Sequence, residues 1–184
     1  MELDLFQRFQ QRLTAAGGEA YAASSLVQAA EIIAAHPALT NGQVIVPPGF
    51  AEHPVWGALL PLLAARGIVA RDADTPGGVA DAPAGLSGAE MAIAETGSVL
   101  LADNALETRL VGMLTLAHFV LAERSHLVPM LDDAGNLLQR LTRTGNGQRH
   151  YISIITGPSR TADIERTLTI GVQGPRTLCA LIVG

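Results

Sequence analysis

Lysine is absent from this chain, because all twelve basic residues are arginine. A P-loop lysine, a Schiff-base lysine and a lysine general base are therefore excluded. Any anion that binds here must be held by arginine, backbone N–H groups, hydroxyl groups or a metal ion. The net charge is −5. Since nucleic-acid-binding proteins normally carry a basic face, we expect no nucleic acid as a partner.

Cysteine is almost absent, since Cys179 is the only one. A single cysteine excludes an internal disulfide and fits a reducing compartment. This chain also cannot hold an iron–sulfur cluster by itself, because such a cluster usually takes about four cysteines. Cys179 lies in an apolar run, where we expect it to be inert core. The five histidines form no His-Glu-x-x-His motif, and we expect no metal site.

Long apolar runs are also lacking, and none approaches the roughly 20 residues that a membrane span needs. The first residues, MELDLFQRFQQRL, show no basic head followed by an apolar run, so we expect no secretory signal. Gly-x-Ser-x-Gly does not occur, which gives a hydrolase nucleophile elbow no support. Together these absences predict a cytoplasmic protein.

What is present fits a globular α/β protein. The 184 residues, 48% of them hydrophobic, predict one domain over 1–184, with an N-terminal helix in residues 1–20 packing on it. Apolar runs alternate with segments of helical period, which predicts a mainly parallel sheet with helices on both faces. The predicted strands are 44–46, 68–70, 99–101, 118–121, 126–128, 151–155 and 178–183. The predicted helices after the first are 26–36 (capped by Ser24 or Ser25), 53–66, 106–116 and 129–143.

Two stretches are less regular. Residues 72–83 are dense in turn formers, which predicts a surface loop. Residues 88–94 alternate weakly, and strands joined by a turn at 95–98 compete there with a helix favoured by the alanines.

The strongest candidate site lies in the last thirty residues. The strand 151–155 runs into Thr156-Gly157-Pro158-Ser159-Arg160-Thr161, a short helix is expected next, and a second turn, Gly174-Pro175-Arg176, precedes the last strand. Ser159 and Thr161 would cap the helix, whose free N–H groups attract anions. Arg160 and Arg176 could bind a carboxylate or phosphate through paired hydrogen bonds. Asp163 and Glu165 in the first turn of that helix oppose an anion. In the alternative interpretation, Ser159 and Thr161 only cap the helix and Arg160 pairs with Asp163.

A second candidate is the turn Glu95-Thr96-Gly97-Ser98. A carboxylate beside small hydroxyl residues can act as a nucleophile or general base, so Glu95 is the candidate catalytic residue. The alternative is an ordinary turn with a solvated glutamate. We expect both turns to form one pocket. Its predicted ligand contacts are Thr96, Gly97, Ser98, Thr156, Gly157, Ser159, Arg160, Thr161, Asp163, Gln173, Gly174 and Arg176.

Two segments carry a resemblance to a known family. AIAETGSVLLAD (residues 92–103) and ITGPSRTADIERTLTIGVQGPRTLCALIVG (residues 155–184) resemble the LUD-domain family, in particular its short form, the lactate utilization protein C group. The resemblance implies a fold like that of ribose-5-phosphate isomerase, glucosamine-6-phosphate deaminase and CoA transferases. It also implies a role in bacterial oxidation of L-lactate to pyruvate, together with iron–sulfur partner proteins that supply the clusters. Relatives often have histidine where this chain has Gln173, and a glutamine there can hydrogen-bond a ligand but not exchange a proton with it.

Several functions therefore stay open. The first is a non-redox subunit of a lactate-oxidising system that binds a small anionic metabolite and needs no cofactor in this chain. The second is an independent enzyme of the CoA-transferase or sugar-phosphate-handling type, with Glu95 as nucleophile or base. The third is a small-molecule-binding module without chemistry. Apolar residues in the C-terminal half permit a homo-oligomer.

Overall fold

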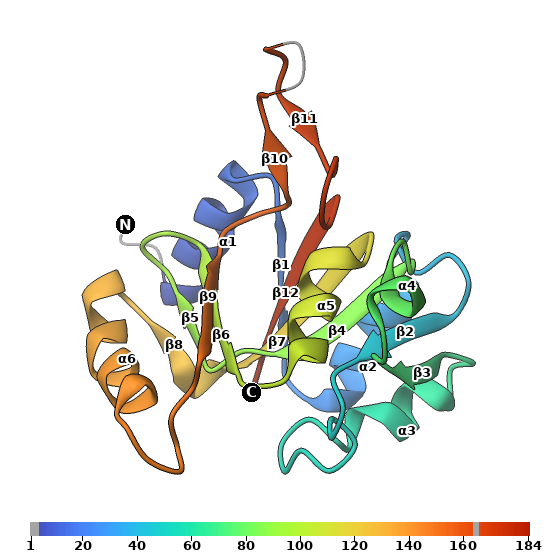
Figure 1. The fold of residues 1–184 in the computed structure, drawn as a ribbon, viewed down its shortest axis with the longest axis horizontal. Coiled ribbons are helices and arrows are strands. Elements are labelled where there is room, and N and C mark those ends of the chain that lie inside the picture. Colours follow the sequence, from blue (N-terminus) through green and yellow to red (C-terminus); the bar gives the residue numbers. More distant parts are fainter. Residues whose placement is uncertain (1–3, 164–165) are drawn as a thin grey trace.

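The main element of the fold is a six-stranded, fully parallel sheet. The computed structural model describes residues 4–163 and 166–184, and its largest sheet has the order β1-β12-β7-β4-β2-β3. The strands are β1 (Glu19–Ala23), β2 (Gln43–Val46), β3 (Val69–Asp72), β4 (Ala84–Gly88), β7 (Ala117–Glu123) and β12 (Thr177–Val183). The predicted mainly parallel sheet is confirmed (Figure 1).

A second, smaller sheet lies beside the first. Its order is β8-β5-β6-β9, with strands β8 (Leu127–Val128), β5 (Met91–Ile93), β6 (Ser98–Asp103) and β9 (Tyr151–Ile155). β5 and β6 form an antiparallel hairpin through the turn at Glu95. The strand alternative for residues 88–94 is therefore correct and the helix is wrong, because Ala92 and Ile93 lie buried between sheet neighbours rather than along one helical face.

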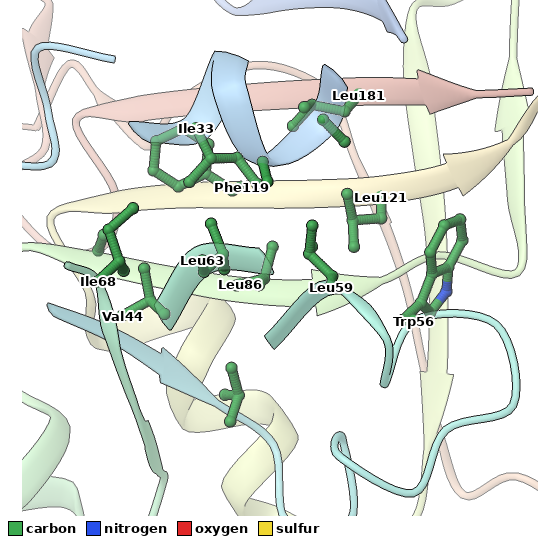
Figure 2. Packing of buried hydrophobic residues seen from close by; sticks show 14 of the residues in the cluster. Ile33, Val44, Trp56, Leu59, Leu63, Ile68, Leu86, Phe119, Leu121 and Leu181 are labelled. Carbon is green, nitrogen blue, oxygen red and sulfur yellow. The ribbon is translucent and has the colours of Figure 1, made fainter. Parts of the chain in front are cut away.

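Helices cover both faces of the main sheet, as predicted. Helices α2 (Leu26–Ala35) and α3 (Leu59–Ala64) pack on one face, and Figure 2 shows Ile33 and Leu63 facing Phe119 and Leu86 of the strands. The other face carries α1 (Leu5–Ala15), α4 (Pro76–Val79), α5 (Leu106–Leu114) and the second sheet. The outer face of the second sheet is covered by α6 (Ala134–Thr142).

The start of α2 and the end of α1 agree with the sequence signals, although residues 19–20 of the predicted N-terminal segment belong to β1. Ser25 caps α2 by accepting a hydrogen bond from the backbone N–H of Gln28 at 3.3 Å. Gly17, with a φ of 82°, follows the end of α1. Phe9 and Leu13 of α1 are fully buried against the two sheets, so this helix is an integral part of the core.

Three predicted boundaries are wrong. The helix predicted over 53–66 is only 59–64, because the ring of His53 accepts hydrogen bonds from two following backbone N–H groups and holds that segment in turns. The helix predicted from Pro129 begins at Ala134, after a 3-10 turn at Leu131–Asp133. The loop predicted over 72–83 contains the short helix α4, with Thr75 as its N-cap.

The largest error concerns the segment after β9. Residues Arg160–Thr161 form β10 and pair with β11 (Thr169–Ile170) in an antiparallel hairpin, where a helix was predicted. Ser159 and Thr161 therefore cap no helix, and Asp163 lies in no helical first turn among the described residues. Figure 1 shows this hairpin projecting from the body of the protein. Residue 165, also assigned to the predicted helix, lies outside the described residues.

The described part of the chain contains no helix that is both long and apolar enough to cross a membrane.

Candidate functional site

Two cavities lie at opposite edges of the main sheet. The amino-edge cavity, of about 600 Å³, is bounded by α5, β9 and the starts of β7 and β12. The carboxyl-edge cavity, of about 240 Å³, is bounded by the ends of β2, β4, β6 and β7. Ligands of open α/β sheets usually bind beyond the carboxyl ends of the strands. Five predicted ligand contacts instead line the amino-edge cavity, namely Thr156, Gly157, Ser159, Gln173 and Gly174.

The two C-terminal turns meet at the amino-edge cavity. The backbone N–H of Ser159 donates to the carbonyl oxygen of Pro175 at 2.9 Å, and the Ser159 hydroxyl donates to the carbonyl oxygen of Gln173 at 2.5 Å. The backbone N–H of Gly171 donates back to the carbonyl oxygen of Ser159 at 2.9 Å. The second turn precedes β12, which explains why this cluster lies at the amino edge of the main sheet and not at the carboxyl edge.

The turn that follows Glu95 contacts this cluster through hydroxyl groups. The Ser98 hydroxyl lies 2.7 Å from that of Thr96 and 2.5 Å from that of Thr156. Gly97 and Gly157, with φ values of 69° and 72°, both approach the C-terminal end of α1 so closely that a Cβ atom would clash with its backbone. Three predicted turns are thus brought together, and both glycines serve close packing.

The two acidic residues of the prediction, Glu95 and Asp163, line neither cavity. Glu95 lines neither cavity, and its Oε2 accepts a hydrogen bond from the backbone N–H of Leu131 at 2.9 Å. Asp163 is exposed and donates its backbone N–H to the Thr161 hydroxyl at 3.3 Å.

Arg160 and Arg176 are exposed residues that flank the lining of the amino-edge cavity. Arg160 follows Ser159, and Arg176 follows Pro175, so each is next in sequence to a lining residue. Among the described residues, neither guanidinium makes a hydrogen bond or ion pair, and the alternative pairing of Arg160 with Asp163 is not observed. Both cations are therefore available to a ligand anion.

Sequence reasoning missed His118, which also lines the amino-edge cavity. Its Nε2 lies 2.7 Å from the Ser87 hydroxyl, and its Nδ1 has no partner among the described residues. Burial lowers the pKa of His118 to about 4, so the imidazole is neutral at pH 7. The sequence signal for His118 is a histidine inside the apolar run Ala117–Val120. Its partner, Ser87, lies in another strand, so the sequence did not indicate the pair.

The carboxyl-edge cavity is lined by polar residues that the sequence did not single out, among them Ser87, Glu90, Asp103, Glu123, His126 and Arg149. Burial opposes ionisation of Asp103, but hydrogen bonds from Thr108, Ala105 and Asn104 outweigh it and lower the pKa of Asp103. Asp103 is therefore an ionised carboxylate that fixes the start of α5.

The two cavities favour binding through hydrogen bonds over thiol or metal chemistry. Cys179 is fully buried, and burial raises the pKa of its thiol. The described residues contain no group of three or more His, Cys, Asp or Glu side chains placed to hold a metal ion. The amino-edge cavity instead offers hydroxyls, an amide and a neutral imidazole beside two exposed arginines.

Residues 77–183 match the LUD domain family. Lactate utilization protein C 1 of Bacillus mycoides (strain KBAB4) is 32% identical over 99 residues, which cover 54% of this chain and 42% of that protein. Lactate utilization protein C of Bacillus subtilis (strain 168) is 28% identical over 152 residues, 78% of this chain and 63% of that protein. Each match spans less than two thirds of the relative.

A solved structure shows the same fold over nearly the whole chain. A DUF162 family protein from Deinococcus radiodurans superposes with a TM-score of 0.69 and 22% identity, over 98% of this chain and 97% of that chain.

Proposed function

The chain belongs to the LUD-domain family, and on that premise we propose that it serves the oxidation of L-lactate to pyruvate as a component without a redox centre. The observation that carries the proposal is the similarity to relatives named lactate utilization protein C, which for the Bacillus subtilis protein extends over 78% of this chain. This oxidation removes two electrons and two protons from lactate. Iron–sulfur partner proteins would take the electrons, because the single, buried cysteine of this chain cannot ligate a cluster.

The part of this chain in that system is to bind a small carboxylate at the amino-edge cavity. Thr156, Ser159 and Gln173 supply polar groups at its wall. Arg160 and Arg176 stand next to that wall without partners among the described residues, and a carboxylate would give them one.

An independent enzyme of the sugar-phosphate-handling or CoA-transferase type is the second candidate. The carboxyl-edge cavity favours it, since this edge of a parallel sheet is where enzymes of open α/β folds bind their substrates. The position of Glu95 counts against it, because the glutamate that would act as nucleophile or base caps Leu131 and lines neither cavity.

A native, anaerobic pull-down of the tagged protein from lactate-grown source cells tests the proposal, with mass spectrometry and an iron assay. Co-purifying iron–sulfur proteins with lactate-dependent electron transfer are expected. If the protein purifies without iron and without partner proteins, the independent enzyme becomes the favoured function.

The carboxylate site is tested by calorimetric titration with pyruvate and L-lactate. Arg160→Ala and Arg176→Ala should each weaken binding of the carboxylate by about 1.5–3 kcal/mol, the scale of a charged hydrogen bond. Arg143→Ala is the matched control, since Arg143 is an exposed arginine at the end of α6 that does not line the amino-edge cavity. Equal affinity in all four proteins would return both arginines to a structural role.

A further inference from the structure

An indole N–H at the carboxyl-edge cavity has no hydrogen-bond partner. Trp56 lines this cavity and is 3% exposed. Among the described residues its Nε1–H makes no hydrogen bond, yet the nitrogen retains accessible surface, unlike the Nδ1 of His118. Figure 2 shows the indole at one end of the core cluster, with its nitrogen on the side away from Leu59. Because buried polar groups are nearly always hydrogen-bonded, this donor needs an acceptor that enters the cavity.

Gly88 leaves the indole nitrogen uncovered. It lines the same cavity at the end of β4, and a Cβ atom there would lie only 2.6 Å from Trp56 Nε1. Any larger residue at this position would therefore fill the space beside the donor.

Two further donors line this cavity. The Nδ1 of His53 accepts hydrogen bonds from the backbone N–H groups of Val55 and Trp56, both at 3.2 Å, so the neutral ring carries its proton on Nε2. Arg149 is half-buried, and its guanidinium makes no hydrogen bond or ion pair among the described residues. An indole, an imidazole and a guanidinium thus offer N–H groups to one ligand.

Carboxylates line the cavity beside these donors. Asp103 already accepts three hydrogen bonds at the start of α5. Glu90 and Glu123 accept none among the described residues, although Glu123 lies 3.9 Å from the exposed ring of His126. A ligand with only a carboxylate would face these like charges, and a ligand with only an amine would leave the N–H donors unsatisfied. The lining therefore favours a ligand that carries both charges.

The other walls limit the size of that ligand. The cavity has a volume of about 240 Å³, and Pro48, Phe50 and Leu101 form apolar parts of its lining. Such walls suit a small apolar group beside the two charges.

We propose that the carboxyl-edge cavity binds a zwitterionic α-amino acid with a small apolar side chain. Its carboxylate accepts hydrogen bonds from Trp56, His53 and Arg149. Its ammonium group donates to the carboxylates of Glu90 and Glu123. This site is separate from the amino-edge cavity, so the inference does not depend on the proposed function.

Trp56 is the only tryptophan of the chain, so its fluorescence reports on this cavity. The full-length protein is titrated with L-alanine, with L-lactate, in which a hydroxyl replaces the ammonium group, and with ethylamine, which lacks the carboxylate. We expect L-alanine to change the emission of Trp56. Both analogues should need at least about tenfold higher concentrations for the same change, the scale of one lost charged hydrogen bond.

Calorimetric titration with L-alanine tests the donors. Trp56→Phe removes the N–H group but keeps an aromatic ring, and Arg149→Ala removes the guanidinium. Each variant should bind L-alanine about tenfold more weakly. Arg143→Ala should bind it like the wild type, since Arg143 is an exposed arginine that lines neither cavity.

Three results would overturn the inference: no change in Trp56 emission with L-alanine, equal affinities for L-alanine and L-lactate in the fluorescence titration, or wild-type affinity for L-alanine in both Trp56→Phe and Arg149→Ala. Thermal unfolding shows whether Trp56→Phe is folded, because this residue is buried. If that variant does not fold, the wild-type titrations and Arg149→Ala decide the question.

Discussion

At the scale of single residues, the buried imidazole of His118 makes stability depend on pH. Burial lowers its pKa from 6.5 to about 4, so between these values the unfolded chain binds a proton that the folded protein does not. The free energy of unfolding should therefore fall as the pH drops from 6.5 towards 4, by up to about 3 kcal/mol from this group. Urea unfolding of the wild type and His118→Asn at pH 7.5 and 4.5 measures it. A stability difference between the two proteins that is the same at both pH values would contradict this prediction.

Gly97 occupies a position where the structure leaves no room for a side chain. Its φ of 69° is in the left-handed region, and a Cβ atom would clash with the backbone N of Leu13. Gly97→Ala should lower the free energy of unfolding by more than about 2 kcal/mol. Gly135→Ala is the matched control, because Gly135 lies in α6 with open space around it. The control should be neutral or stabilising by about 0.5–1 kcal/mol in the same urea titration. Equal stability of the two variants would show that α1 shifts to accommodate the added Cβ atom at little cost in free energy.

At the scale of elements, the sequence predicted those helix ends that depend on neighbouring residues. The start of α2 followed from a serine cap, and its end from His36-Pro37. β1 escaped prediction because its alanines have little strand preference, and it is held by β12 from the other end of the chain. The hairpin of β10 and β11 was mistaken for a helix because Ser159 and Thr161 are residue types that cap helices as readily as they form turns. The pairing of His118 with Ser87 depends on strand order, which no local pattern contains.

The cap of α2 gives the test at this scale. The Ser25 hydroxyl accepts from the backbone N–H of Gln28, one of the free donors at the helix start. Ser25→Ala should lower the free energy of unfolding by about 1 kcal/mol. The neighbouring Ser24→Ala removes a hydroxyl that contacts only the exposed side chain of Gln28, and should cost less. Thermal and urea unfolding compare the two variants. A larger loss of stability in Ser24→Ala than in Ser25→Ala would show that Ser24, and not Ser25, caps the helix.

At the scale of the whole molecule, the arrangement of the two sheets explains why the predicted site is only partly assembled. The second sheet brings the turns at Ser98 and Thr156 together, which the sequence had placed in one pocket. The same sheet carries Glu95 towards α6 and away from both cavities. The parallel order of the main sheet then decides that the C-terminal turns border its amino edge, since they lie before β12 and not after it.

The projecting hairpin is the surface most suited to a partner. Leu168, Ile170 and Val172, which are 63%, 49% and 49% exposed, lie in β11 or within two residues of it. Exposed apolar groups of this kind mark interaction sites. If the iron–sulfur proteins of the proposed function bind here, Ile170→Asp should reduce their recovery in the pull-down by about tenfold or more, the scale of an interface hot spot. Its thermal unfolding should match the wild type, since the side chain is exposed.

Val69→Asp is the control for that variant, because Val69 is 62% exposed on the edge strand β3 and belongs to another part of the molecule. Light scattering of the isolated protein separates a second copy from a foreign partner. If the wild type is a dimer that Ile170→Asp converts to a monomer, the hairpin joins two copies of this chain. If both proteins are monomers and recovery of the iron–sulfur proteins is the same for Ile170→Asp, Val69→Asp and the wild type, the hairpin is not the partner surface. Because the hairpin meets the body of the protein at Ser159 and Gly171, a partner bound there would lie beside the turns that border the amino-edge cavity.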